Sequence, residues 1–239
     1  MADTATLIAV FTAAGLVMGI TGFGAGLVAM GILVTLMPVA RATVIVAVLG
    51  LACPVLNLWT LRRDIQWREV WPILVTALPA AVLGVFLLKT LSGQILRIAV
   101  AGMILAGCAT MLWSPKKTRL HKSFPWAYGA GALGGVFNGA LGTGGPPVVL
   151  YSLMRGWDKS ISKGVLSAYF TMTGTWRLIV LITSGVATAE DLRLGAWMLI
   201  PALAATYLGT YIFRRMSNNA FRYATMVLLV GLSVKLVLS

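Results

Sequence analysis

Two glycine clusters are the residues of this sequence best suited to chemistry inside an apolar chain. They are Thr21-Gly22-Phe23-Gly24-Ala25-Gly26 and Gly142-Thr143-Gly144-Gly145-Pro146-Pro147. Helix propensity collapses at such clusters, so each is expected to end one helix and begin another. A helix that begins there directs unpaired backbone N–H groups and the positive end of its dipole at the break, which suits an anion.

Polar side chains extend this predicted anion site. Arg177 is the one strongly basic side chain well inside an apolar segment, and Asn57 stands 120 residues before it. A central arginine is costly to insert, which favours a functional role, although its stem could instead reach the membrane surface near Ser184. The predicted substrate-binding residues are Thr21, Gly22, Phe23, Gly24, Ala25, Gly26, Asn57, Gly142, Thr143, Gly144, Gly145, Pro146 and Arg177, with Arg41, Asn138 and Lys163 as weaker candidates.

Several other chemistries are disfavoured by what the apolar segments lack. Cys53 and Cys108 lie in apolar runs without CxxC spacing and His121 lies in a basic loop, so we expect no metal site. No strand precedes the first glycine cluster, which excludes a dinucleotide fingerprint, and no cofactor is expected. All six acidic residues lie in the tail or in loops. An enzyme or a carboxylate proton relay is therefore disfavoured, which leaves downhill anion passage or coupling through protonation of the substrate.

Composition places these residues in a membrane. The chain has 239 residues, 59% apolar and 10% charged, with a mean hydropathy of +0.92. The net charge of +13 comes from short loops beside apolar segments, so nucleic acid is not an expected partner. Eight apolar segments are predicted, at 5–37, 41–61, 69–88, 93–113, 124–154, 164–183, 192–213 and 220–238. The first and fifth are far longer than the about 20 residues of one crossing, which agrees with a break inside each.

The glycines also reveal an internal duplication. Gly15, Gly19, Gly22 and Gly24 match Gly135, Gly139, Gly142 and Gly144 at a constant spacing of 120 residues. We therefore predict a first membrane repeat at 1–113, a basic cytoplasmic linker at 114–123 and a second repeat at 124–239. The alternative is that these glycines only allow helices to pack closely.

The distribution of basic residues selects a topology. If all eight segments cross once, nine basic residues lie on each side. If each glycine-broken segment instead returns to the side it entered from, thirteen lie on one side and five on the other. The positive-inside rule favours the second model. Each half then crosses an odd number of times, so the second repeat is inverted and both termini face the outside, an architecture typical of transporters.

The duplicated glycine breaks, the run Gly142-Thr143-Gly144-Gly145-Pro146-Pro147 and the eight apolar segments resemble the sulfite exporter TauE/SafE family, also called the toluene sulfonate uptake permease family. The resemblance covers nearly the whole chain, with Gly24-Ala25-Gly26 standing where a fuller glycine run is expected. It implies a multi-pass carrier of a small sulfur-containing anion, such as sulfite or an organosulfonate, in the bacterial inner membrane with periplasmic termini.

The predicted fold is thus an all-α polytopic membrane protein of two inverted repeats, each with a glycine-broken re-entrant half-helix hairpin plus three transmembrane helices. Its expected partners are the anion and the lipid bilayer, and a homo-oligomer is compatible with it. Two alternatives stay open: a permease for another small organic anion, and a non-transporting subunit of a membrane assembly.

Overall fold

The computed structural model describes residues 3–63, 65–96, 98–99, 102, 124–217 and 220, and every regular element in these ranges is a helix. The helices are α1 (Thr4–Thr21), α2 (Ala25–Leu36), α3 (Val39–Thr60), α4 (Trp67–Thr90), α6 (Phe124–Leu141), α7 (Gly145–Met154), α8 (Lys159–Thr183) and α9 (Ala189–Arg215). Of these, α1, α3, α4, α8 and α9 are long and apolar enough to cross a membrane. The predicted class of all-α polytopic membrane protein is confirmed.

Part of the sequence prediction lies outside the described residues. This holds for the basic linker at 114–123, for most of the predicted segments 93–113 and 220–238, and for Cys108 and His121. The backbones of the two glycine-broken segments, 5–37 and 124–154, lie within the described ranges.

Both overlong apolar segments are divided into two helices at their glycine clusters. Gly22 follows α1 with a left-handed φ of 80°, and its N–H donates to the Met18 carbonyl. Gly24, with φ 86°, precedes α2. In the second half Gly142, with φ 70°, donates in the same way to the Asn138 carbonyl at the end of α6. Glycine adopts these backbone angles without strain, so the glycines fix where the helices end.

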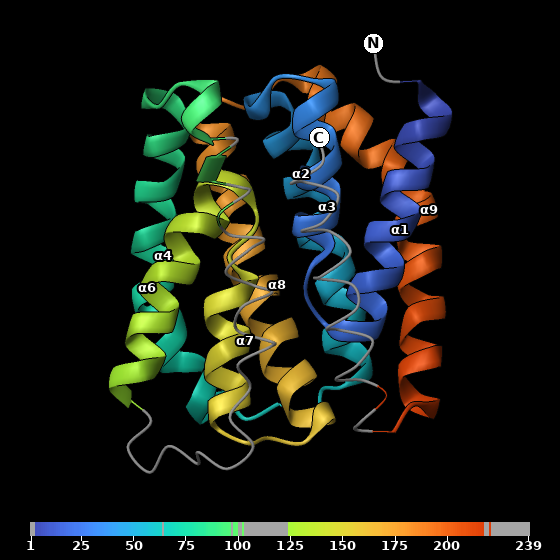
Figure 1. Ribbon diagram of the computed structural model, residues 1–239, viewed down its shortest axis with the longest axis vertical. Helices are drawn as coiled ribbons and strands as arrows, with labels where there is room; N and C mark the ends of the chain where they lie inside the picture. The colour runs from blue at the N-terminus through green and yellow to red at the C-terminus, as the bar shows by residue number, and fades with distance from the viewer. Residues whose placement is uncertain are drawn as a thin grey trace.

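The two broken segments form hairpins that enter the molecule from opposite ends (Figure 1). In that view α1 descends from the upper end and α2 turns back toward it, after which α3 descends and α4 rises. In the second half α6 rises from the lower end and α7 turns back, after which α8 rises and α9 descends. Each hairpin therefore returns to the end from which it started.

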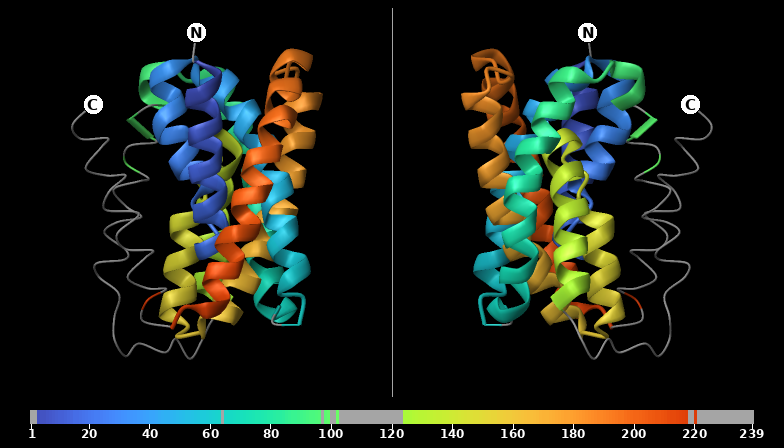
Figure 2. Two further views of the ribbon diagram at one scale, coloured as in Figure 1. Left: turned by 90° about the vertical axis from the view of Figure 1, so that its right-hand side faces the viewer. Right: turned by 90° about the vertical axis from the view of Figure 1, so that its left-hand side faces the viewer.

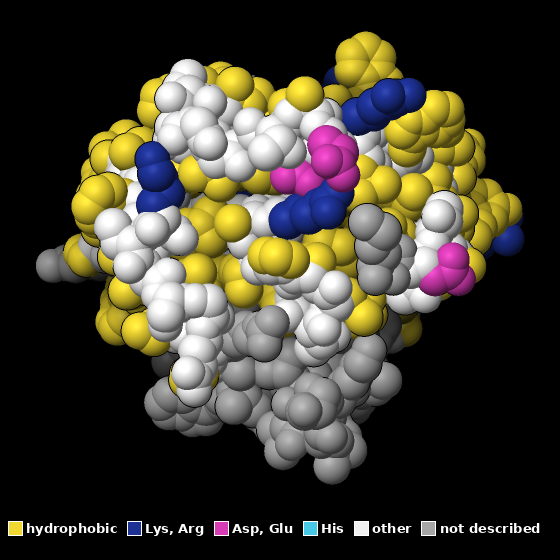
Figure 3. All heavy atoms as spheres, turned by 90° about the horizontal axis from the view of Figure 1, so that it is seen from above, with side chains coloured by type: hydrophobic (Ala, Val, Ile, Leu, Met, Phe, Trp, Pro, Cys, Tyr) yellow, Lys and Arg dark blue, Asp and Glu magenta, His cyan; other side chains and the backbone are white. Residues whose placement is uncertain are grey.

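Basic side chains collect at the lower end of the described structure. The helix ends and loops there carry Arg62, Arg63, Arg68, Arg155, Lys159, Arg214 and Arg215, whereas those at the upper end carry Arg41, Lys89 and Arg193. Figure 3 looks onto the upper end, where the blue side chains are few and scattered. For these residues the division agrees with the unequal distribution of thirteen and five that the re-entrant topology predicts, whereas Lys163, counted among the thirteen, is buried beside Gly19.

Glycines outside the breaks bring helices of the two halves together. The first helix of each half lies beside the last described helix of the other, α1 along α9 and α6 along α4 (Figure 2). A Cβ atom at Gly15 would lie 2.2 Å from the Ala202 carbonyl oxygen, and one at Gly139 would lie 2.1 Å from that of Ala81. Close packing is therefore the role of these glycines, and ending a helix is the role of Gly22 and Gly142.

The re-entrant topology predicts which loops share a side of the membrane. In a background with Cys53 and Cys108 replaced by alanine, Arg63→Cys and Lys159→Cys should react with an impermeant maleimide from the same side, because both positions lie at the lower end. Lys89→Cys should react from the opposite side. If the hairpins crossed instead of returning, Arg63→Cys and Lys159→Cys would be labelled from opposite sides, which would overturn the topology.

Candidate functional site

The two helix breaks meet each other inside the protein. A Cβ atom at Gly26, in the first turn of α2, would lie 1.9 Å from the Gly142 carbonyl oxygen. A Cβ atom at Gly145, the first residue of α7, would lie 3.1 Å from the Phe23 ring and 3.5 Å from that of Phe170. This contact between the two breaks leaves no room for a side chain at Gly26, and a Cβ atom at Gly142 would lie 2.4 Å from Nη1 of Arg177.

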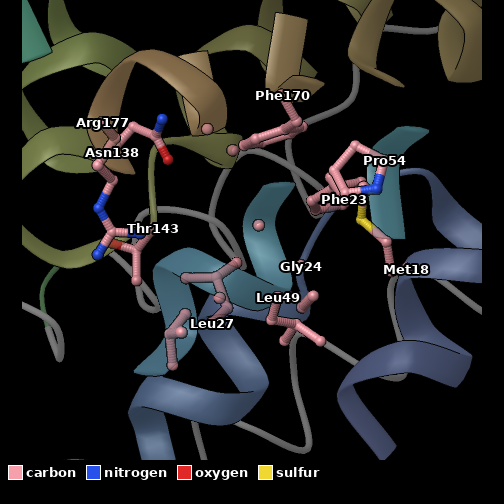
Figure 4. Close-up of a pocket in the computed structure, with 17 residues that line it drawn as sticks. Met18, Phe23, Gly24, Leu27, Leu49, Pro54, Asn138, Thr143, Phe170 and Arg177 are labelled. Atoms are coloured by element: carbon pink, nitrogen blue, oxygen red, sulfur yellow. The ribbon is translucent and has the colours of Figure 1, made fainter. Parts of the chain in front are cut away.

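A cavity of about 30 Å³ lies between the breaks. Its walls are formed by Met18, Phe23, Gly24, Ala25, Gly26, Leu27, Val46, Leu49, Gly50, Pro54, Asn138, Gly142, Thr143, Gly145, Phe170, Gly174 and Arg177. In the close-up, Arg177, Asn138 and Thr143 lie together on one side, and Met18, Phe23, Pro54 and Phe170 lie on the other (Figure 4). The cavity therefore has a polar wall and an apolar wall.

Arg177, on α8, supplies the charge of the polar wall. Its Nε donates to the Gly139 carbonyl at 3.3 Å and its Nη2 to the Thr43 carbonyl at 3.1 Å. No carboxylate among the described residues pairs with it, and Nη1 has no hydrogen bond there. The residue is only 2% exposed, so its side chain stays in the interior and does not extend to the membrane surface.

Two further polar groups of this wall are buried without a partner among the described residues. They are the Asn138 side-chain nitrogen and the Thr143 hydroxyl. Burying a polar group without a hydrogen bond costs about 1–3 kcal/mol, so buried groups of this kind usually face a ligand or water. Together with Nη1 of Arg177, they give three potential donors on residues that line the same small cavity.

The beginnings of α2 and α7 add backbone donors to the cavity. The first N–H groups of a helix have no acceptor within it, and no side chain caps α2. Ala25, Gly26 and Leu27 of that first turn all line the cavity, as does Gly145 at the start of α7. Pro146 and Pro147 follow Gly145 and have no N–H, which leaves no unpaired donor at these two positions. Two positive helix ends thus face the same space.

The opposite helix ends, those of α1 and α6, are closed by donors from α3 and α8. At the α1 end, the Asn57 side-chain amide donates to the Met18 carbonyl at 2.9 Å, and Lys163 Nζ donates to the Gly19 carbonyl. At the α6 end, Arg177 donates to Gly139, and the Thr43 hydroxyl lies 3.4 Å from the Ala140 carbonyl. Each break therefore receives one donor from α3 and one from α8, and both cations come from α8.

Lys163 is buried completely, at 0% exposure, and its charge has no carboxylate partner within the described ranges. Besides Gly19 it contacts the Thr210 hydroxyl at 3.4 Å and lies 4.0 Å from the centre of the Phe213 ring. Thr210 also donates to the Asn57 side-chain oxygen at 2.7 Å. A cation at the carboxyl end of a helix interacts favourably with its dipole, so Lys163 stabilises the end of α1.

Most of the predicted site residues either line this cavity or contact the helix ends beside it. Those that line the cavity are Phe23, Gly24, Ala25, Gly26, Asn138, Gly142, Thr143, Gly145 and Arg177. Asn57 and Lys163 hold the end of α1, as described above. The Thr21 hydroxyl is occupied by the Val17 and Phe23 carbonyls, at 2.8 and 2.7 Å.

The remaining predicted residues are not among those that line the cavity. A Cβ atom at Gly22 would lie 2.7 Å from the Lys163 side chain, and one at Gly144 would lie 2.7 Å from that of Asn138. Pro146 lines a separate apolar groove. Arg41, at the upper end, forms ion pairs with Glu190 and with Asp191, the latter at 2.7 Å.

Sequence reasoning missed most of the apolar wall and the two threonine hydroxyls that support the breaks. The repeat spacing contained a signal for some of them. Gly50 and Phe170 stand 120 residues apart, as do Pro54 and Gly174, and all four line the cavity. Thr43 and Lys163 have the same spacing and play matching roles at opposite breaks.

Comparison with known proteins found one matching family model and a similar curated protein. The family model described as "Sulfite exporter TauE/SafE" matches residues 7–236. A protein of Cupriavidus necator (strain H16), named "Probable sulfite/organosulfonate exporter TauE", is 26% identical over 224 residues, which cover 92% of this chain and 88% of that protein. No solved structure matches the chain.

The contacts of Lys163 predict its effect on stability. Lys163→Met should lower the free energy of unfolding by about 1–2 kcal/mol, because the Gly19 carbonyl loses its charged donor and the α1 dipole its cation. Thermal unfolding in detergent measures this change. Arg193→Met, which removes an exposed cation that makes no hydrogen bond or ion pair among the described residues, is the control and should leave the midpoint near that of the wild type. Equal midpoints for the two variants would contradict the assigned role.

Proposed function

This chain belongs to the sulfite exporter TauE/SafE family, and we propose that it carries a sulfur-containing oxyanion through the cavity between its two helix breaks. The family is one of membrane transporters and not of enzymes. In the proposal the beginnings of α2 and α7 bind the anion, with Arg177, Asn138 and Thr143 as side-chain ligands.

The observation that carries the proposal is the excess of unpaired donors around one small cavity. An oxyanion such as sulfite offers only acceptors, and it would receive hydrogen bonds from Nη1 of Arg177, from the two unpartnered polar groups and from the helix N–H groups. It would also supply the negative charge that Arg177 lacks among the described residues.

The two walls suit the group that sulfite and organosulfonates share. In the proposal the oxygens of an SO₃ group lie against the polar wall, and an organic substituent would point toward Phe23, Pro54 and Phe170. The apolar wall is also the feature that favours the second candidate, a permease for another small organic anion. Competition of sulfite uptake by sulfonates and by carboxylates distinguishes the two.

The opposed hairpins support a carrier with alternating access. In this account the two halves are inverted repeats, and the cavity opens to one end of the molecule when one hairpin shifts relative to the other. The described acidic residues lie at helix ends and loops, and none lines the cavity. Proton coupling through a carboxylate in the site is therefore not part of the proposal. The same account places the protein in a bacterial inner membrane with its termini in the periplasm.

Thr143 gives the most specific test, because its hydroxyl makes no hydrogen bond among the described residues and a substitution there removes none from the fold. Thr143→Val should raise the half-saturating sulfite concentration for flux into proteoliposomes about fivefold, which corresponds to one hydrogen bond of about 1 kcal/mol. Its unfolding midpoint should not fall. Arg177→Ala should reduce flux at least tenfold, and Arg177→Lys should reduce it less, because it keeps the charge.

Ser167→Ala is the matched control, since the Ser167 hydroxyl is likewise buried without a partner among the described residues but does not line the cavity. It should leave both flux and half-saturation unchanged. Wild-type transport by both Thr143→Val and Arg177→Ala would exclude this cavity as the anion site.

A further inference from the structure

A polar groove lies at the lower end of the molecule, outside the proposed transport site. It is lined by Trp59, Thr60, Arg62, Arg63 and Arg214 and has a volume of about 540 Å³. The first four residues belong to the end of α3 and the turn after it, and Arg214 belongs to the last turn of α9. Three guanidinium groups from two separate helix ends thus share one groove.

Within the described residues, the arginines of this groove have no acidic partner, in contrast to two other arginines of the chain. Arg41 is paired with Glu190 and Asp191, and Arg155 is paired with Glu69. In the part of the chain that the structure describes, no carboxylate pairs with the arginines of the groove. Asp64, which follows Arg63 in the sequence, is not among the described residues. Like charges that share a groove repel one another, and an anion bound among them removes this repulsion.

The groove also lies at the level expected for lipid headgroups. Trp59 is 71% exposed, and the Arg62 guanidinium lies 5.1 Å from the centre of its ring. Beyond the turn, at the start of α4, Trp67 and Trp71 are exposed as well, with ring centroids 6.5 Å apart. Exposed tryptophans of membrane proteins concentrate at the boundary between lipid and water, so this end of α3 and α4 lies at that boundary.

We propose that this groove binds the phosphate headgroup of an anionic phospholipid. Guanidinium groups bind phosphate through paired hydrogen bonds, and the planar groups of Arg62, Arg63 and Arg214 would share the phosphate oxygens. The positive-inside rule accounts for basic residues at this end in general. It does not account for their meeting in one groove from two distant parts of the sequence, whereas a bound headgroup does.

The test compares two double variants that remove equal charge from opposite ends of the protein. Arg63→Gln with Arg214→Gln removes one guanidinium from each side of the groove, and Lys89→Gln with Arg193→Gln removes two exposed cations from the upper end. Purified full-length protein in neutral detergent is titrated with phosphatidylglycerol, with phosphatidylcholine and with inorganic phosphate. Thermal unfolding and native mass spectrometry report binding.

Phosphatidylglycerol should raise the unfolding midpoint of the wild type and of the upper-end variant, and phosphatidylcholine should not. The groove variant should bind phosphatidylglycerol about 30-fold more weakly, from about 1 kcal/mol for each basic residue at a membrane surface. It should also retain one lipid fewer in the mass spectrum. Equal binding of phosphatidylglycerol by both variants would overturn the proposal. So would stabilisation by inorganic phosphate alone, which would identify the groove as a site for free anions.

Discussion

Backbone carbonyls at a helix end must find donors within the protein when that end lies inside a membrane, because no water is there to supply them. Two helices of this chain, α1 and α6, end in the interior. Asn57 and Lys163 supply donors at the first end, and Arg177 and Thr43 supply them at the second. The buried cations of α8 follow from this requirement, since a guanidinium or ammonium group suits the negative end of a helix dipole.

Closing these carbonyl ends leaves the first N–H groups of α2 and α7 without acceptors, and in our proposal this asymmetry makes the region an anion-binding site. The donors of α3 and α8 turn toward α1 and α6, whereas the first turns of α2 and α7 face a cavity. Arg177 serves both purposes, because two of its nitrogens donate to backbone carbonyls and the residue also lines the cavity. A change at Arg177 is therefore expected to affect both the α6 end and the affinity for an anion.

The sequence predicted the breaks and the buried arginine because both depend on local properties. A dense run of glycines inside an overlong apolar segment favours a helix end, and an arginine inside an apolar segment is conspicuous in any fold. The spacing of 120 residues also paired Asn57 with Arg177, and each donates to the end of the broken helix in its own half. Which donors turn into the cavity could not be predicted, because that depends on how each helix is rotated about its axis. Contacts such as that of Gly15 with Ala202 set this rotation, and they join segments far apart in the sequence.

The most direct measurement is the position of a bound oxyanion in an experimental structure. Selenite has the shape and charge of sulfite, and its selenium atom scatters anomalously, so crystals of the protein grown with selenite would locate the ion without reference to protein density. The account predicts an anomalous peak between the first turns of α2 and α7, within hydrogen-bonding distance of the Arg177 guanidinium through the selenite oxygens. Selenite bound elsewhere, with this cavity empty at saturating concentration, would contradict it.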